Sequence, residues 1–305
     1  MRSLRFAAAA AAVLGDRSFN TSRWIDVSNR ISLVYDAAAD YHPEFAGYKG
    51  KTVKQADVVL LPFPLLMPMN SSTRLNDLKF YENRTDNGGP AMTWAMFAIG
   101  HWDVGDVDEA QSLFNRSYAN VQEPYGVWTE TPSGGTTNFI TGAGGFLQGV
   151  INGLAGVRLG AASSGGSSSI TFHPQCSSSL AASSGAVNGV CVRPVSSSAL
   201  RSCFCHSSLC ERGADLRLSP LALDVFLTRG RCRYFRGWRL TFEWTTSTSA
   251  GQPLPTSTVT GFKSPLSPDD ASPALAVAYQ GKSLELREGE PLSFDGCPAV
   301  AVVLA

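Results

Sequence analysis

The spacing of apolar residues predicts helices through the first half of the chain. Asn20-Thr21-Ser22 supplies capping side chains for a first helix. Its apolar face, near i, i+3, i+7 and i+10, is formed by Trp24, Val27, Ile31 and Val34. A second helix is predicted over Arg74–Tyr81, with its end near Asn83.

The most apolar segment follows the turn at Asn87-Gly88-Gly89. Pro90 suits the first turn of a helix, where its missing N–H costs nothing. The helix is apolar nearly all round, through Met92, Trp94, Met96, Phe97 and Ile99. Such a helix is expected to be buried. Gly105-Asp106 opens the next helix, which ends before Asn120.

Asn138–Val157 combines helical periodicity with repeated glycine. The glycines on its regular face are Gly142, Gly145, Gly149 and Gly153. Each costs about 1 kcal/mol relative to alanine inside a helix, so we expect helices to approach closely there. Val121–Gly135, just before it, is predicted to be a loop. Helix pairs joined by loops that carry the polar candidates describe an α/α toroid.

The periodicity changes after the Gly/Ser-rich joint Gly160–Ser169. Ile170–Phe172 and Trp238–Trp244 alternate apolar and polar residues and are predicted to be strands. Ser177–Gly230 is rich in Ser, Ala and Cys, and Thr245–Ala274 is rich in Ser, Thr and Pro. Their periodicity is weak, and we expect no regular structure in either segment.

Composition and charge narrow the class of ligand. The 305 residues are 44% hydrophobic and 16% charged, which allows a sizeable core in one large domain or two smaller ones. The 25 basic and 25 acidic residues cancel, so no net field recruits nucleic acid or an anionic membrane. We expect neither of these partners and no cofactor. A neutral ligand such as a carbohydrate fits this balance.

All 7 cysteines lie in the second half of the chain. Their odd number and irregular spacing argue against a compact disulfide framework, so we expect reduced thiols. Cys203-Phe204-Cys205-His206, with Cys210, offers ligands that zinc accepts. The spacing fits no common finger or ribbon, and we predict no metal site.

The N-terminus allows two interpretations. Arg2 and Arg5 precede the apolar run Phe6–Gly15, as in a short signal peptide. Alternatively, Leu4–Leu14 is the tail of an Ala-rich helix. We expect a cytoplasmic protein, with secretion as the alternative if residues 1–15 act as a signal. No apolar run approaches the roughly 18 residues needed to span a bilayer.

Two short segments carry groups suited to a saccharide. Val53–Leu61 contains Lys54 and Gln55, and Val127–Glu130 contains Trp128 and a carboxylate. A cation and an amide bind hydroxyls, an indole stacks on a sugar ring, and carboxylates hydrolyse the glycosidic bond. Taken alone, Lys54 and Gln55 also suit a plain surface position. Trp128 suits a sugar platform and a core aromatic equally well.

The amino-acid sequences of these segments and their order along the chain resemble those of glycoside hydrolase family 65. The likeness rests on Lys54-Gln55 before A-D-V, and on W-T-E ahead of N-F-x-T-G-x-G-G-F-L-Q. It extends over about Ile31–Pro174 and returns faintly at Tyr234–Trp244. Within the family, the chain most resembles members that release glucose from glucosylgalactosyl-hydroxylysine of collagen.

The resemblance implies a mainly α fold, with the later part of an (α/α)6 toroid over residues 1–158. Residues 159–305 would hold the joint, a Cys/Ser-rich insertion with disordered segments, and a β-sandwich-like remnant. Lys54 and Gln55 would bind the substrate sugar, with Trp128 as a third candidate. Glu130 would be the general base of an inverting hydrolysis. Phosphorolysis has no use for a base there, so the retained glutamate favours hydrolysis.

The family's general acid belongs to an earlier part of the toroid, and no residue here matches it. The chain therefore resembles a truncated form, and half a toroid would expose an apolar flank that favours self-association. Two alternatives stay open: an inactive carbohydrate-binding fragment, or a disaccharide phosphorylase. Near the site, His42 and Glu44 are expected to be structural, and Asp57 to cap or orient its helix.

Overall fold

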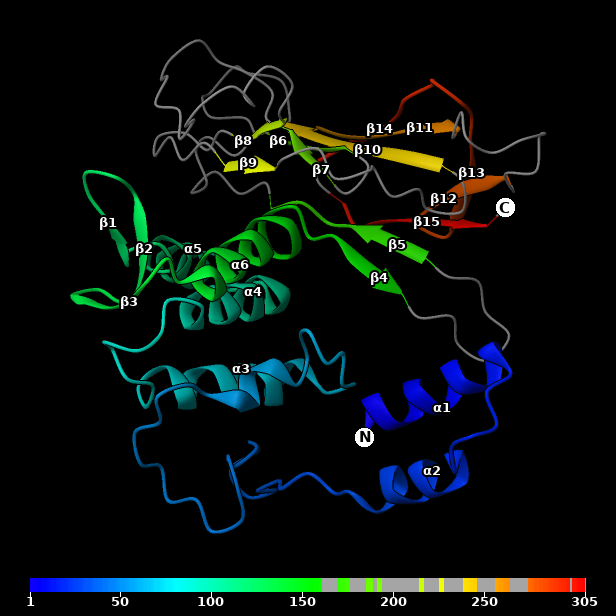
Figure 1. The fold of residues 1–305 in the computed structure, drawn as a ribbon. Helices are drawn as coiled ribbons and strands as arrows, with labels where there is room; N and C mark the ends of the chain where they lie inside the picture. The colour runs from blue at the N-terminus through cyan, green and yellow to red at the C-terminus, as the bar shows by residue number, and fades with distance from the viewer. Residues whose placement is uncertain are drawn as a thin grey trace.

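The computed structural model describes the helical half continuously and the second half in parts (Figure 1). The described residues are 1–160, 169–175, 185–188, 191–193, 214–216, 225–227, 238–245, 256–263, 274–296 and 298–304. Helices fill one end of the molecule. Two five-stranded sheets lie at the other end, beyond the layer that contains α4 and α6 (Figure 1).

The first two helices pack against each other at one edge of the molecule (Figure 1). α1 (Arg2–Leu14) is the Ala-rich segment, and α2 (Thr21–Arg30) follows it. The Arg5 Nε donates a hydrogen bond to the Ser28 Oγ at 2.9 Å and so joins the pair. Within the described residues, no helix combines the length and the apolarity that crossing a membrane requires.

α2 begins as predicted but ends earlier. The Asn20 Oδ1 accepts the N–H of Arg23 at 3.0 Å, which confirms the predicted cap. The helix ends at Arg30, because Ile31 is extended with φ −74° and ψ 121°. The prediction that Ile31 and Val34 lie on the helix was therefore wrong. Their side chains are 41% and 39% exposed, so they do not pack against a surface that would extend the helix beyond Arg30.

Three helices form the central layer: α3 (Ser71–Glu82), α4 (Thr93–Val104) and α5 (Val107–Arg116). All three lie where the sequence predicts them. The expected burial of α4 is confirmed, since Phe97 and Ile99 are fully buried. Pro90 lies ahead of this helix rather than in its first turn, because Met92 occupies the N-cap.

The segment predicted to be a loop before the glycine-rich helix is a small antiparallel sheet. Its strands are β1 (Val121–Gln122), β2 (Val127–Thr131) and β3 (Gly134–Thr137). Gly134 and Gly135, with φ of 135° and 83°, allow the tight turn between β2 and β3. The Gln122 Nε2 donates to the Thr129 Oγ1 at 3.1 Å and links β1 to β2. The loop prediction was wrong because strands this short leave no periodic signal.

The glycine-rich helix is α6 (Ile140–Gln148), continued by the π-helical stretch η2 (Gly149–Leu154). The close approach predicted from its glycines is confirmed. A Cβ on Gly145 would lie 2.9 Å from the Met92 Cα, and a Cβ on Gly153 would lie 2.4 Å from the Trp102 ring. Larger side chains at these positions would push the helix away from α4.

Two five-stranded sheets pack face to face in the second half. The first has the order β13-β12-β15-β5-β4, with β4 (Arg158–Gly160), β5 (Ser169–Phe172), β12 (Leu275–Tyr279), β13 (Lys282–Leu286) and β15 (Val300–Leu304). The second has the order β14-β11-β10-β6-β7, with β6 (Gly185–Asn188), β7 (Cys191–Arg193), β10 (Trp238–Thr245), β11 (Thr256–Lys263) and β14 (Leu292–Asp295). Between the sheets, Phe172 stacks on Phe242 with ring centroids 4.6 Å apart. The two predicted strands are confirmed as β5 and β10.

Regular structure also occurs where none was expected. β11 lies inside residues 245–274 and pairs with β10 from Trp238 opposite Lys263 to Thr245 opposite Thr256. Ser257 on this strand is buried, so a polar residue faces inward and removes the alternation that would have predicted a strand.

Four short strands lie inside residues 177–230. They are β6, β7, β8 (Ala214–Leu216) and β9 (Val225–Leu227). The expectation of no regular structure was therefore wrong at these four places. The candidate zinc ligands at 203–210 lie outside the described residues, so the prediction about a metal there stays a prediction.

The helical and β parts share one hydrophobic core. The carbonyl of Leu154 accepts the N–H of Gln175 at 2.8 Å, which ties the end of η2 to the segment after β5. Gly156 has a φ of 61°, and a Cβ there would lie 2.0 Å from the His173 carbonyl oxygen, so only glycine fits. β4 crosses the predicted boundary between residues 158 and 159, and the division into two domains stays a prediction.

Candidate functional site

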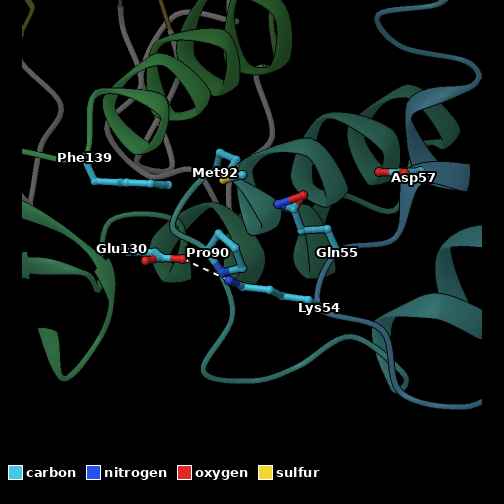
Figure 2. Close-up of a pocket in the computed structure, with 7 residues that line it drawn as sticks. All are labelled: Lys54, Gln55, Asp57, Pro90, Met92, Glu130 and Phe139. Atoms are coloured by element: carbon cyan, nitrogen blue, oxygen red, sulfur yellow. Dashed lines mark hydrogen bonds and ion pairs between the residues drawn. The ribbon is translucent and has the colours of Figure 1, made fainter. Parts of the chain in front are cut away.

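An open pocket of about 320 Å³ lies where separate segments of the helical half meet. Its lining residues are Lys54, Gln55, Asp57, Pro90, Met92, Glu130 and Phe139. Figure 2 shows Glu130 and Phe139 entering from one side, and Lys54 and Gln55 from the other. The structure therefore brings together three of the four predicted site residues. Their roles toward a substrate stay predictions.

Lys54 and Gln55 follow a backbone segment held from both sides. The N–H of Val53 donates to the Arg84 carbonyl at 2.8 Å, and its carbonyl accepts the N–H of Asp86 at 2.9 Å. A Cβ on Gly89 would lie 3.0 Å from the Lys54 carbonyl oxygen, so this glycine lets the two segments touch. The Lys54 side chain is thus carried on a fixed backbone although the chain has no regular secondary structure there.

The short 3₁₀ helix η1 (Asp57–Leu60) follows the Lys54-Gln55 pair. The Glu44 Oε1 accepts the N–H of Asp57 at 2.9 Å and so supplies the cap of this helix. Burial raises the pKa of Glu44. Asp57 is the acidic residue in the first turn of η1 and its side chain also lines the pocket, whereas the cap hydrogen bond comes from Glu44.

His42, the other residue expected to be structural, lies in a buried network. Its Nδ1 is 2.9 Å from the Asp77 Oδ2, and its N–H donates to the Asp77 Oδ1 at 2.7 Å. The Tyr81 hydroxyl donates to the His42 carbonyl at 2.8 Å. These contacts fix the segment ahead of Glu44 onto α3, so the structural roles expected for His42 and Glu44 are confirmed.

Glu130 lies on β2, and its backbone is fixed to neighbouring elements. Its carbonyl accepts the N–H of Ala91 at 3.0 Å and the Nδ2 of Asn120 at 2.7 Å. These bonds attach β2 to the segment before α4 and to the end of the α5 region. The carboxylate is thereby carried on strand backbone rather than on a free loop.

The Glu130 carboxylate has one cationic and one hydroxyl partner. The Lys54 Nζ donates to its Oε1 at 3.0 Å, across 76 residues of sequence (Figure 2). The Thr136 Oγ1 donates to its Oε2 at 3.4 Å. The hydrogen bond and the charge of Lys54 hold the pKa of Glu130 below its ordinary value, with a smaller contribution from Thr136. The carboxylate is therefore ionised at neutral pH.

Trp128, the fourth predicted site residue, packs against the core instead. Its ring centroid is 5.7 Å from that of Phe146, and a Cβ on Gly142 would lie 2.8 Å from its Nε1. The Nε1 is buried and has no hydrogen-bond partner among the described residues. Trp128 does not line the pocket, so the structure gives its predicted role in sugar binding no support.

Phe139 lines the pocket and was not singled out from the sequence. It occupies the N-cap of α6, and Asn138 before it is in the left-handed region with a φ of 53°. Asparagine tolerates this conformation better than most residues. The Asn138-Phe139 pair at the start of a predicted helix indicates a turn in the sequence. It does not indicate that the Phe139 ring faces the pocket.

A second pocket of about 380 Å³ opens between α3, α4 and α5. It is lined by Lys79, Glu82, Asn83, His101, Asp106, Asp108 and Glu109. The buried His101 has its Nδ1 3.1 Å from the Asp106 Oδ2 and its Nε2 3.4 Å from the Glu82 Oε2. Among the described residues, no group of His, Cys, Asp and Glu side chains is arranged to hold a metal ion. None of the predicted site residues lies here.

Comparison with known proteins gives relatives for about half of the chain. No family model matches the sequence. The protein-glucosylgalactosylhydroxylysine glucosidase of Danio rerio is 48% identical over 160 residues, which are 52% of this chain and 24% of that protein. The protein of the same name from Mus musculus is 46% identical over 176 residues, 57% of this chain and 24% of that one. This chain is a relative of these glucosidases.

A kojibiose hydrolase of Mucilaginibacter mallensis is 42% identical over 118 residues, which are 38% of this chain and 18% of that protein. The resemblance predicted from the sequence is thus confirmed for the matched part. This part spans about a quarter of the length of the two glucosidases, so it matches only one section of those proteins.

Proposed function

We propose that this chain takes part in hydrolysing an α-glucosidic bond, and that it acts on glucosylgalactosyl-hydroxylysine of collagen to release glucose. The observation that carries the proposal is the ion pair between Lys54 and Glu130, which lies in one pocket with Gln55. The relatives named as glucosidases and as a kojibiose hydrolase support the reaction class.

Glu130 would act as the general base of an inverting reaction. A base must be ionised before it can activate water, and the contact with Lys54 favours the ionised form of Glu130. A general acid needs the opposite, a carboxyl group that keeps its proton. Glu130 therefore suits the base role and not the acid role. Its side chain is 24% exposed, so water can reach it.

Lys54 and Gln55 would hold the hydroxyls of the glucose unit. The Lys54 ammonium carries three N–H donors and uses one on Glu130, and the Gln55 amide can donate and accept at once. The pocket volume of about 320 Å³ falls at the small end of ligand pockets, which typically measure about 300–1,000 Å³. A site of this size suits one sugar ring better than a long oligosaccharide.

The proposal assigns the general acid to no residue of this chain. It extends to the architecture: the helical half would be the later part of an (α/α)6 toroid, and the paired sheets would be the β-sandwich-like region beside it. The alternatives, an inactive carbohydrate-binding fragment and a disaccharide phosphorylase, share the pocket but differ in the fate of the glycosidic bond. The hydrolase names of the relatives favour hydrolysis over phosphorolysis.

Self-association is a further part of the proposal. Large apolar side chains are exposed along the segment from α2 to the loop after it, namely Ile25, Ile31, Leu33, Val34 and Tyr35. Exposed apolar side chains of this kind favour contact with another protein surface. Sedimentation velocity across a range of concentrations tests it, and a constant monomer at all concentrations would exclude it.

The deciding experiment is a glucose-release assay on glucosylgalactosyl-hydroxylysine with the wild-type chain and Glu130→Gln. Loss of release in the variant, with sugar binding retained, supports Glu130 as the base. Binding without release in both proteins points to the carbohydrate-binding alternative. Release that requires inorganic phosphate points to the phosphorylase.

A further inference from the structure

We propose that Phe139 is the aromatic platform of the pocket, on which the C–H face of the bound sugar ring stacks. The proposal rests on the proposed carbohydrate function and names the residue that recognises the ring. The ligand class is a neutral pyranose whose equatorial hydroxyls leave one face of C–H bonds.

The two aromatic candidates near Glu130 differ in what they touch. Trp128 packs against the hydrophobic core, with its ring near Phe146 and Gly142. Phe139 is not part of this core, and among the described residues no aromatic ring pairs with it. It is half-buried and lines the pocket. The ring of Trp128 is therefore occupied by core packing, and the ring of Phe139 is available to a ligand.

The backbone around Phe139 holds its ring toward the pocket. The N–H of Phe139 donates to the Trp128 carbonyl at 2.9 Å, and its carbonyl accepts the N–H of Gly142 at 2.9 Å. Asn138, with φ of 53°, makes the turn from β3 into α6 just before it. The bond to Trp128 connects Phe139 to β2, the strand that carries Glu130, and the bond from Gly142 fixes it to α6.

The pocket has an apolar wall and a polar wall. Phe139, Met92 and Pro90 form the apolar wall, and Figure 2 shows the Phe139 ring extending beside Glu130 toward Met92. Lys54, Gln55 and Glu130 provide the polar groups. A pyranose has the same two characters, because its hydroxyls point outward around the ring and its C–H bonds cover a face. An aromatic ring binds such a face through apolar contact and through its negative quadrupole.

Equilibrium binding of a thio-linked kojibiose analogue, which resists hydrolysis, tests the proposal by isothermal titration calorimetry on the full chain. Phe139→Ala is expected to weaken binding by about tenfold or more, since losing an apolar contact of about 1.4 kcal/mol changes Kd tenfold. Phe139→Tyr keeps the ring and should bind within about threefold of the wild type. Phe139→Leu keeps apolar volume without a π face and should resemble the alanine variant.

Ile140→Ala is the matched control, because Ile140 is the next residue, is 84% exposed and does not line the pocket. It should bind as the wild type does. Thermal unfolding of Phe139→Ala should stay close to that of the wild type, because Phe139 lies outside the core.

Each outcome decides the proposal. Wild-type affinity in Phe139→Ala overturns the platform and leaves the proposed hydrolysis standing. Equal losses in Phe139→Ala and Phe139→Tyr would mean that the ring face is not what the ligand needs. If the wild-type chain fails to bind the analogue, both the platform and the carbohydrate function are wrong.

Discussion

Two pockets of similar size lie on the helical half, and their carboxylates behave in opposite ways. In the pocket between β2 and the Lys54 segment, a cation lowers the pKa of Glu130. In the pocket between α3, α4 and α5, burial and the neighbouring Glu82 raise the pKa of Glu109. The acidic pocket has more carboxylates, but the ionised form of its Glu109 is disfavoured, whereas that of Glu130 is favoured.

The difference lies in what surrounds each carboxylate. Glu130 faces one cation, one hydroxyl and an apolar wall, so its charge is stabilised beside surface that can hold a ligand. Glu109 lies in the first turn of α5 with Asp108, and burial and the charge of Glu82 disfavour its ionised form. The acidic pocket gathers like charges, whereas the Glu130 pocket combines a cation, an amide and an apolar wall, the groups that the proposed sugar site requires.

The largest expected effect separates the two pockets by activity. Glu130→Gln should lower glucose release by about 10²–10⁴-fold, the usual contribution of a general base, because the amide cannot accept a proton from water. Glu109→Gln, the same change in the other pocket, should leave the rate within about twofold of the wild type. Steady-state release of glucose from glucosylgalactosyl-hydroxylysine measures both. Equal losses in the two variants would contradict the distinction.

The next effect concerns the wall that α6 provides to the Glu130 pocket. Gly145→Ala should destabilise the fold by about 1–3 kcal/mol, because the new Cβ would lie 2.9 Å from the Met92 Cα and force α6 away from α4. Gly144→Ala is the matched control in the same helix. Nothing lies within 4 Å of its Cβ position, so the alanine should stabilise by up to about 1 kcal/mol. Urea denaturation measures both, and a stable Gly145→Ala variant would contradict the tight contact.

The glycine contacts show what the sequence can predict in this fold. Glycines repeated in a helical pattern lower the stability of the helix itself. Their presence therefore indicates that another helix packs too closely for a larger side chain. The apolar character of α4 is equally informative, because it surrounds the helix over several turns and so predicts burial. Lys54, Gln55 and Glu130 were predicted from the short sequence motifs that contain them, although 76 residues separate Lys54 from Glu130, which it contacts.

The missed features depend on contacts between distant segments. The cap of η1 comes from Glu44 on another segment, and no local pattern distinguishes that carboxylate from Asp57. Phe139 reaches the pocket because β3 and a left-handed Asn138 turn it there, whereas Trp128, beside the motif glutamate, points into the core. β11 was missed because its partner β10 lies elsewhere in the chain and its buried Ser257 hides the alternation.

A smaller effect tests the cation of the Glu130 pocket. Lys54→Met removes the main cause of the low pKa of Glu130, so the carboxyl should take up its proton at higher pH than in the wild type. The acid limb of kcat/KM should move to higher pH accordingly. Carbon-13 NMR titration of the Glu130 carboxyl measures the same shift without turnover. Lys79→Met, in the acidic pocket, is the control and should leave the titration of Glu130 unchanged.

The smallest effect is the opposite pH dependence of stability in the two pockets. The pKa of Glu109 is raised in the folded chain, so its ionised form destabilises the fold above that pKa, and this penalty disappears below its ordinary value of 4.5. Glu109→Gln should therefore stabilise the fold at neutral pH and have no such effect in acid. Glu130 has a lowered pKa, so its ionised form stabilises above 4.5, and this contribution is lost as the pH falls through the folded value. Glu130→Gln should destabilise the fold at neutral pH and not in acid.

Urea unfolding at both pH values measures the free energy of unfolding of the two variants. The same sign of change for both variants at neutral pH would show that the two carboxylates do not differ as their surroundings require.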